Sequence, residues 1–162
     1  MRVFPLIVLA ALATACAPAP PTVQGRASVI DGDTLDLHGS RIRLWGVDAP
    51  ESRQLCDTDA GPERCGQIAA NRLDAHMANR SIDCFEQDVD RYGRMVARCE
   101  IGGEDLGGWL VSEGLAVRYE RYAGLAYLAE EISARRARRG IWRGDFQTPE
   151  EWRRDQRTGP VS

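Results

Sequence analysis

Three short segments between residues 26 and 45 alternate apolar and polar side chains, and turn sequences separate them. The segments are 26–30, 35–37 and 41–45, and the turns contain Asp31-Gly32 and His38-Gly39. A period of two is that of a β-strand with one buried face, and Asp-Gly is a strong turn signal. The pattern therefore predicts three consecutive antiparallel strands.

The following residues mix helices with two further strands. Residues 81–87 and 94–101 are expected to form strands joined by a loop at 88–93, and apolar residues at helical spacing predict a helix over 62–79. A second, short helix is expected before Gly114, and a third, with Leu125, Leu128 and Ile132 on one face, before Gly140. Five short strands with inserted helices predict an α+β domain, a five-stranded OB-fold barrel with about three helices.

The first residues have the pattern of an export signal. Arg2 precedes an apolar run over residues 6–13, shorter than the ~20 residues that a membrane-spanning helix needs. We expect 1–15 to be a signal peptide, 16–24 a Pro/Ala-rich linker, 25–145 the folded domain and 146–162 a polar C-terminal tail. The small residues before Cys16 fit either lipid attachment at this cysteine or ordinary signal cleavage. The protein is therefore expected in the periplasm or cell envelope as a membrane-attached lipoprotein, or secreted.

Five cysteines are an odd number for an exported protein. With Cys16 lipidated or removed, four remain, and sequence order favours the pairs Cys56–Cys65 and Cys84–Cys99. The first pair would close a loop, and the second would join the two strands of a predicted hairpin. Disulfides are the expected state in an oxidising compartment, whereas the alternative, a zinc site, lacks a Cys-x-x-Cys spacing.

All 21 cationic side chains are arginine, and the net charge of the chain is −3. Proteins that bind nucleic acids usually present a basic face to the phosphates. The acidic balance argues against tight, nonspecific binding of nucleic acid, but it allows a local site lined by arginines.

Three charged segments, 29–34, 43–51 and 90–94, join strands to turns. Asp33 and Asp48 offer hard oxygen ligands that suit Ca²⁺, and Arg43 and Arg94 could hold a phosphate bidentately. Glu51 could position or deprotonate a water molecule. Each segment alone is more often a plain turn or a solvated strand end, but together they predict a site for phosphoryl transfer. The chain has no Gly-x-Ser-x-Gly motif and no P-loop, and its two histidines are interpreted as structural.

These segments resemble the signature of the staphylococcal nuclease-like (thermonuclease) family. The family pattern is Asp-Gly-Asp-Thr, then Arg-x-x-x-Val-Asp-x-Pro-Glu, then Asp-x-Tyr-Gly-Arg, and all three occur here in that order, starting at Asp31, Arg43 and Asp90. The resemblance covers about residues 25–145 and implies an OB-fold barrel with three helices. It also implies a calcium-dependent endo- or exonuclease, which hydrolyses phosphodiester bonds of DNA or RNA by in-line attack of an activated water and leaves 3′-phosphates.

The resemblance assigns roles to the acidic motif residues first. Asp33 and Asp48 correspond to the carboxylates that bind calcium. Ala49 corresponds to a position that binds calcium through its backbone carbonyl, so alanine is expected to be tolerated there. Glu51 corresponds to the proposed general base.

The remaining matches concern the substrate. Arg43 and Arg94 correspond to arginines that bind the phosphate and stabilise the charged transition state, and Tyr92 and Tyr122 to tyrosines near the nucleotide. The basic loop lysines of well-known relatives have no counterpart in this lysine-free chain. This departure bears on affinity and substrate range, and the sequence does not distinguish DNA from RNA.

The alternative interpretation is an OB-fold module that binds nucleic acid or a protein without catalysis. Relatives of that kind usually lose the arginines or the acidic ligands, and all of these are present here. We therefore expect an active enzyme whose partner is DNA or RNA, and a monomer, the default for this fold.

Overall fold

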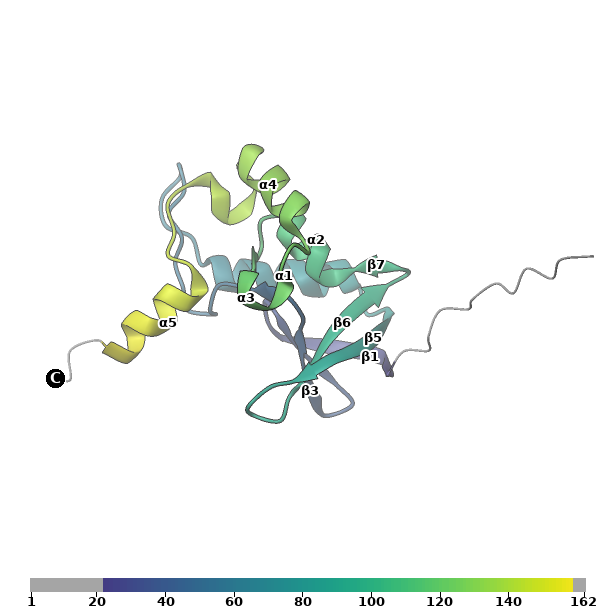
Figure 1. Ribbon diagram of the computed structural model, residues 1–162. Coiled ribbons are helices and arrows are strands. Elements are labelled where there is room, and N and C mark those ends of the chain that lie inside the picture. The colour runs from purple at the N-terminus through teal and green to yellow at the C-terminus, as the bar shows by residue number, and fades with distance from the viewer. Residues whose placement is uncertain (1–21, 159–162) are drawn as a thin grey trace, which may run out of the picture.

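The computed structural model describes residues 22–158, and its centre is a closed five-stranded barrel (Figure 1). Hydrogen-bonded neighbours follow the order β3-β2-β1-β5-β6, and a parallel pairing of β3 with β6 closes the ring. The barrel strands are β1 (Val23–Asp31), β2 (Thr34–Leu37), β3 (Ser40–Leu44), β5 (Ser81–Val89) and β6 (Met95–Ile101). Outside the ring, β7 (Glu104–Asp105) pairs with β6, and β4 (Val47–Asp48) pairs with β8 (Val117–Arg118). The predicted OB-fold barrel of an α+β domain is confirmed.

The described part of the chain has five α-helices, which are α1 (Cys65–Met77), α2 (Leu106–Ser112), α3 (Glu120–Ala123), α4 (Leu128–Arg136) and α5 (Pro149–Thr158), and a 3-10 helix, η1 (Gly140–Arg143). Helix α1 packs against β1, and α2 packs against β6 and α4. The predicted inward residues of α1, Ala69, Leu73 and Met77, are all buried. They join the inward side chains of the barrel strands in one hydrophobic core. None of the helices in residues 22–158 is both long and apolar enough to span a membrane.

The expected third helix is divided in two. Gly124 and Tyr127 have positive φ angles of 55° and 62°, which interrupt the right-handed helix between α3 and α4. Leu125 therefore lies outside both helices and is exposed, and Ile132 is also exposed. The prediction that Leu125, Leu128 and Ile132 share one helix face was therefore wrong for Leu125, and the buried residues of α4 are Glu131 and Ala134.

Two other helix boundaries differ from the prediction. Helix α1 begins at Cys65 instead of near Pro62, because Glu63 pairs with Cys56 in an isolated β-bridge that holds the preceding residues extended. The segment expected to be only a polar tail contains α5, which is drawn in yellow in Figure 1. Strand β1 begins at Val23, slightly before the predicted domain boundary.

Both predicted disulfides are present. Cys84 and Cys99 face each other across β5 and β6. Cys56 and Cys65 tie the loop after β4 to the first residue of α1. The predicted signal peptide and Cys16 lie outside the described residues.

Candidate active site

Asp33 and Asp48 lie together at one end of the barrel, and Arg43 joins them. The Arg43 guanidinium donates from Nη1 to Asp33 Oδ1 (2.9 Å) and from Nη2 to Asp48 Oδ1 (3.0 Å). Asp33 is in the turn between β1 and β2, Arg43 is on β3, and Asp48 is in β4. Both carboxylates are buried, with 5% and 1% of the residue exposed. Burial alone would lower the pKa of Arg43, but the two carboxylates outweigh it and raise this pKa, so the arginine stays charged.

Asp33 is fixed by two further hydrogen bonds. The Thr34 hydroxyl donates to Oδ1 (3.1 Å), and the Ala49 N–H donates to Oδ2 (3.0 Å). Gly32 permits this close approach, because a Cβ there would lie 2.6 Å from the Ala49 Cβ. Burial raises the pKa of Asp33 to about 7, although Arg43 opposes the rise. This carboxylate is therefore short of compensating positive charge.

The residues around Asp33 fit a hard divalent cation. The carboxylates of Asp33 and Asp48, and the backbone carbonyl of Ala49 that follows them, are oxygen donors of the kind that Ca²⁺ prefers. A cation here would favour the charged form of Asp33, which burial disfavours. Within residues 22–158 no group of three or more His, Cys, Asp or Glu side chains is arranged to hold a metal. Backbone, water or substrate oxygens would therefore have to complete the coordination.

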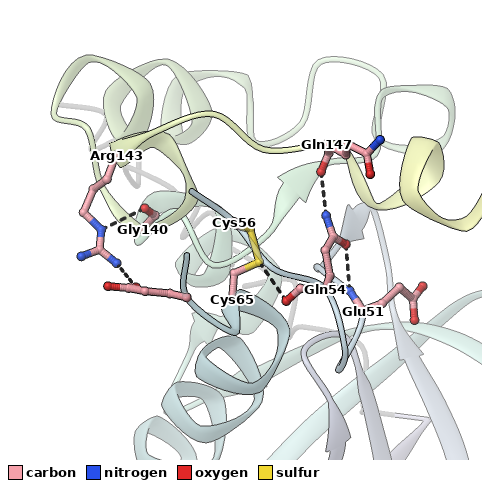
Figure 2. The surroundings of a disulfide bond; sticks show 8 residues. Glu51, Gln54, Cys56, Cys65, Gly140, Arg143 and Gln147 are labelled. Atoms are coloured by element: carbon pink, nitrogen blue, oxygen red, sulfur yellow. Dashed lines mark hydrogen bonds and ion pairs between the residues drawn. A yellow bond between two sulfur atoms is a disulfide. The ribbon is translucent and has the colours of Figure 1, made fainter. Parts of the chain in front are cut away.

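Glu51 lies in the loop after β4, and Gln54 holds this loop in place (Figure 2). The Glu51 N–H donates to Gln54 Oε1 (3.1 Å), and Gln54 Nε2 donates to the Gln147 carbonyl (2.7 Å). Gln54 is fully buried, and its own carbonyl oxygen lies 3.5 Å from the Cys65 sulfur. Gly66 of α1 packs against the same loop, where a Cβ would come within 1.9 Å of the Glu51 carbonyl oxygen. The position of Glu51 therefore depends on the disulfide, on α1 and on the chain before α5.

Arg153 of α5 reaches the same site, which the sequence did not predict. Its Nη1 donates to Glu51 Oε1 (2.9 Å) and Asp48 Oδ1 (3.0 Å), and its Nη2 donates to Asp48 Oδ2 (2.8 Å). Burial lowers the pKa of Arg153, but the hydrogen bonds to Asp48 and Glu51 outweigh burial and raise it. Arg153 is therefore charged, and it shares Asp48 with Arg43.

A sequence signal for α5 was present. Thr148 and Glu151 form a capping box, in which the Thr148 N–H donates to Glu151 Oε2 (2.9 Å) and the Glu151 N–H donates to Thr148 Oγ1 (3.3 Å). Pro149 occupies the first helical position, where its missing N–H costs nothing. These local signals predict the helix, but they do not indicate where it docks.

The turn between β5 and β6 supplies Arg94 and Tyr92. Asp90 orders this turn, because its carboxylate accepts from the backbone N–H of Tyr92 and of Arg94 (both 2.9 Å) and from Arg94 Nε (2.6 Å). Burial acts to raise the pKa of Asp90, but the hydrogen bonds from Arg94 and Tyr92 together outweigh burial and lower this pKa. Tyr92 is 72% exposed, and the Arg94 guanidinium lies 5.6 Å from the centre of its ring. Asp90 belongs to the third motif, but its role was not predicted from the sequence.

These groups line or adjoin one cleft of about 660 Å³. Every predicted site residue lines it except Asp48, which is bound beneath it by Arg43 and Arg153. Tyr122 packs edge to face on Tyr119, with ring centres 5.0 Å apart, and both rings line the cleft. The arginines that line it are Arg43, Arg91, Arg94, Arg121, Arg153 and Arg157. Hydrogen-bond donors for phosphate oxygens and aromatic faces for bases therefore surround the buried carboxylates.

Comparison with known proteins gives a match consistent with this geometry. The family model described as "Staphylococcal nuclease homologue" matches residues 41–144, which include Arg43, Asp48, Glu51 and Arg94. The chain belongs to the staphylococcal nuclease family. Helix α5, and with it Arg153, lies beyond the residues that the family model matches.

Three relatives within the staphylococcal nuclease family cover most of the chain. The succinoglycan biosynthesis protein ExoI of Rhizobium meliloti (strain 1021) is 39% identical over 145 residues, which are 88% of this chain and 76% of that protein. The micrococcal nuclease of Shigella flexneri is 33% identical over 78% of this chain and 77% of its own length. Protein ParB of Escherichia coli is 31% identical over 90% and 89%. These names refer to different processes. Nuclease chemistry for this chain is therefore supported by its membership of the family and not by any single relative.

Proposed function

We propose that this protein is a calcium-dependent nuclease that hydrolyses phosphodiester bonds in DNA or RNA and leaves 3′-phosphates. The observation that supports this most is the single cleft in which Arg43, Arg94 and Glu51 surround the buried pair of Asp33 and Asp48. Membership of the staphylococcal nuclease family supports nuclease activity in general. Calcium and the polarity of cleavage follow from the resemblance of the motifs.

In the proposed reaction two arginines hold the phosphate, Arg43 from β3 and Arg94 from the turn between β5 and β6. Arg43 is fixed by Asp33 and Asp48, and Arg94 is fixed through its Nε by Asp90. Such prearranged guanidinium groups stabilise the charge that develops on phosphoryl oxygens. A bound Ca²⁺ would supply further positive charge beside the same phosphate.

Glu51 is the proposed base for the attacking water. Its backbone is held by Gln54, so its carboxylate is presented at the rim of the cleft. It would accept a proton from the water as the oxygen attacks phosphorus, and the bond to the 5′ oxygen breaks. Tyr92 and Tyr122 are proposed to contact the nucleotide, since both side chains are more than half exposed in the cleft.

The deciding experiment is hydrolysis of heat-denatured DNA, and of RNA in parallel, by the purified protein with its disulfides intact. We expect cleavage with Ca²⁺ that stops when the ion is chelated, and products that a polymerase extends only after phosphatase treatment. Glu51→Gln should cut much more slowly while melting at the same temperature. A folded protein that cuts neither substrate would instead favour the catalytically inactive binding module.

We also propose that the protein acts outside the cytoplasm, as a lipoprotein attached through Cys16 or as a secreted form. Two disulfides among the described residues support an oxidising compartment. Labelled palmitate should appear on the protein in its host if Cys16 is lipidated. A soluble, unlabelled mature form would leave ordinary secretion.

A further inference from the structure

Arg153 makes the polar contacts between the side chains of helix α5 and the barrel. Of the hydrogen bonds and ion pairs that α5 side chains make within residues 22–158, only those of Arg153 reach outside the helix and its preceding turn. Pro149 is the one residue of α5 that is buried. The docking of α5 therefore depends mainly on Arg153.

Arg153 binds the proposed cation ligand Asp48 and the proposed base Glu51. Asp48 Oδ2 and Glu51 Oε1 each accept a hydrogen bond from Arg153, and Asp48 Oδ1 is shared between Arg153 and Arg43. The Asp48 carboxylate, whose side chain is 2% exposed, is thus engaged on both oxygens by guanidinium groups. Three of the roughly four acceptor positions of this carboxylate are therefore taken by guanidinium groups, so a divalent ion would have to compete with them.

The chain before α5 is fixed independently of this contact. The Asp57 N–H donates to the Asp145 carbonyl (2.9 Å), and Gln54 donates to the Gln147 carbonyl, as Figure 2 shows. These anchors end immediately before the capping box that starts α5. The helix can therefore separate from Asp48 while the preceding residues stay in place.

We propose that Arg153 and a divalent cation compete for Asp48, so that α5 is a lid whose release accompanies binding of the cation. The identity of Asp48 as a cation ligand rests on the proposed function. The competition is a property of the side chains themselves. Arg43 cannot serve as the lid, because it lies on a barrel strand and also bridges to Asp33.

The test measures calcium binding by isothermal titration calorimetry, without substrate. Arg153→Gln removes the competing charge, and we expect its Ca²⁺ affinity to exceed that of the wild type about tenfold, as for loss of a charge-assisted pair. Arg154→Gln is the matched control on the same helix, because that side chain is 61% exposed and, among residues 22–158, pairs only with the adjacent Asp155. It should bind Ca²⁺ like the wild type. Equal or weaker affinity in Arg153→Gln, or no binding by either protein, overturns the proposal.

Hydrogen exchange gives a second readout. Saturating Ca²⁺ should speed exchange of the α5 amides after Arg153 in the wild type, while the barrel amides do not speed up. Unchanged or greater protection of α5 with calcium would overturn the lid.

The two proposals fail separately. If Arg153→Gln raises the Ca²⁺ affinity but the protein cuts no nucleic acid, only the nuclease proposal is refuted. If the protein is an active nuclease and Arg153→Gln leaves its Ca²⁺ affinity unchanged, only the lid proposal is refuted.

Discussion

The Cys56–Cys65 disulfide is expected to contribute to both stability and activity, because it ties the end of the loop that carries Glu51 to α1. Its cysteines are 9 residues apart, and those of Cys84–Cys99 are 15 apart. Closing loops of these sizes lowers the entropy of the unfolded chain, which stabilises the fold by about 2.6 and about 3 kcal/mol at 25 °C. Each bridge should therefore raise the melting temperature by roughly 10 °C, at about 4 °C for each kcal/mol.

The two bridges should differ in their effect on activity. All four cysteines are buried, so replacing either pair with alanine removes similar buried groups. Removing Cys56–Cys65 also frees the loop in which Gln54 holds Glu51, and a shift of ~1 Å in a reacting group can cost ~100-fold in rate. Removing Cys84–Cys99 affects the hairpin of β5 and β6, far along these strands from the Asp90 turn.

The assay is nuclease kcat measured well below both melting temperatures, together with thermal unfolding. We expect Cys56→Ala with Cys65→Ala to lose roughly 10- to 100-fold in kcat, and Cys84→Ala with Cys99→Ala to stay within a few-fold of the wild type. Equal kcat in the two double variants would show that the first bridge does not position Glu51. An unchanged melting temperature in either would refute the entropic argument.

Three further predictions concern the cleft. Arg94→Ala should lower kcat by about 100- to 1,000-fold, as loss of one donor to a charged transition state does. Arg41 is an exposed arginine outside the cleft, so Arg41→Ala should keep the wild-type kcat. Equal kcat values for the two variants would remove Arg94 from the mechanism. Gly66→Ala should lower both the melting temperature and kcat, because the new Cβ would meet the Glu51 carbonyl oxygen. In Gly108→Ala of α2 the new Cβ would make ordinary contacts at 3.4 Å or more, so this variant should melt at or above the wild-type temperature. Unfolding scans that rank the two variants the other way would contradict the packing argument. A labelled single-stranded oligonucleotide should bind more tightly with Ca²⁺ than with chelator in Glu51→Gln, measured by fluorescence anisotropy, and calcium-independent affinity would count against a cation at the phosphate.

The barrel could be predicted because its signals are local. The alternation of side chains along β1 to β3 and the turns between them are properties of neighbouring residues, and the buried faces of Leu35, Leu37, Ile42 and Leu44 follow from that alternation. The motif residues could also be placed, since each stands at a strand end that the barrel brings to one side. Helix α1 was predictable for the same reason, as its apolar residues recur at a helical spacing.

The contacts that were missed join distant parts of the chain. Arg153 and Asp48 are 105 residues apart, and Gln54 and Gln147 are 93 apart. The local pattern of a polar helix does not indicate its docking surface, because the contact is made by one arginine, Arg153, among several on the helix. Likewise, the break at Tyr127 arises from packing, since the ring lies against Trp45 and its hydroxyl donates to Asp105 (2.8 Å), and these contacts hold a backbone conformation that local propensity disfavours.

The acidic composition of the chain and a phosphate-binding site are compatible for a physical reason. The chain has 21 arginines against 24 carboxylates, but the cleft lining has six arginines against five carboxylates, with Asp48 beneath as a further one. Such a cleft is close to neutral, so it has little of the excess positive potential with which basic proteins attract nucleic acids at long range. Its affinity must come from short-range contacts, in which guanidinium groups are fixed by Asp33, Asp48 and Asp90, and from positive charge added when a cation binds. A cation that displaced Arg153 would also free that guanidinium at the edge of the same cleft, so metal binding would add positive charge and release a phosphate ligand in one step.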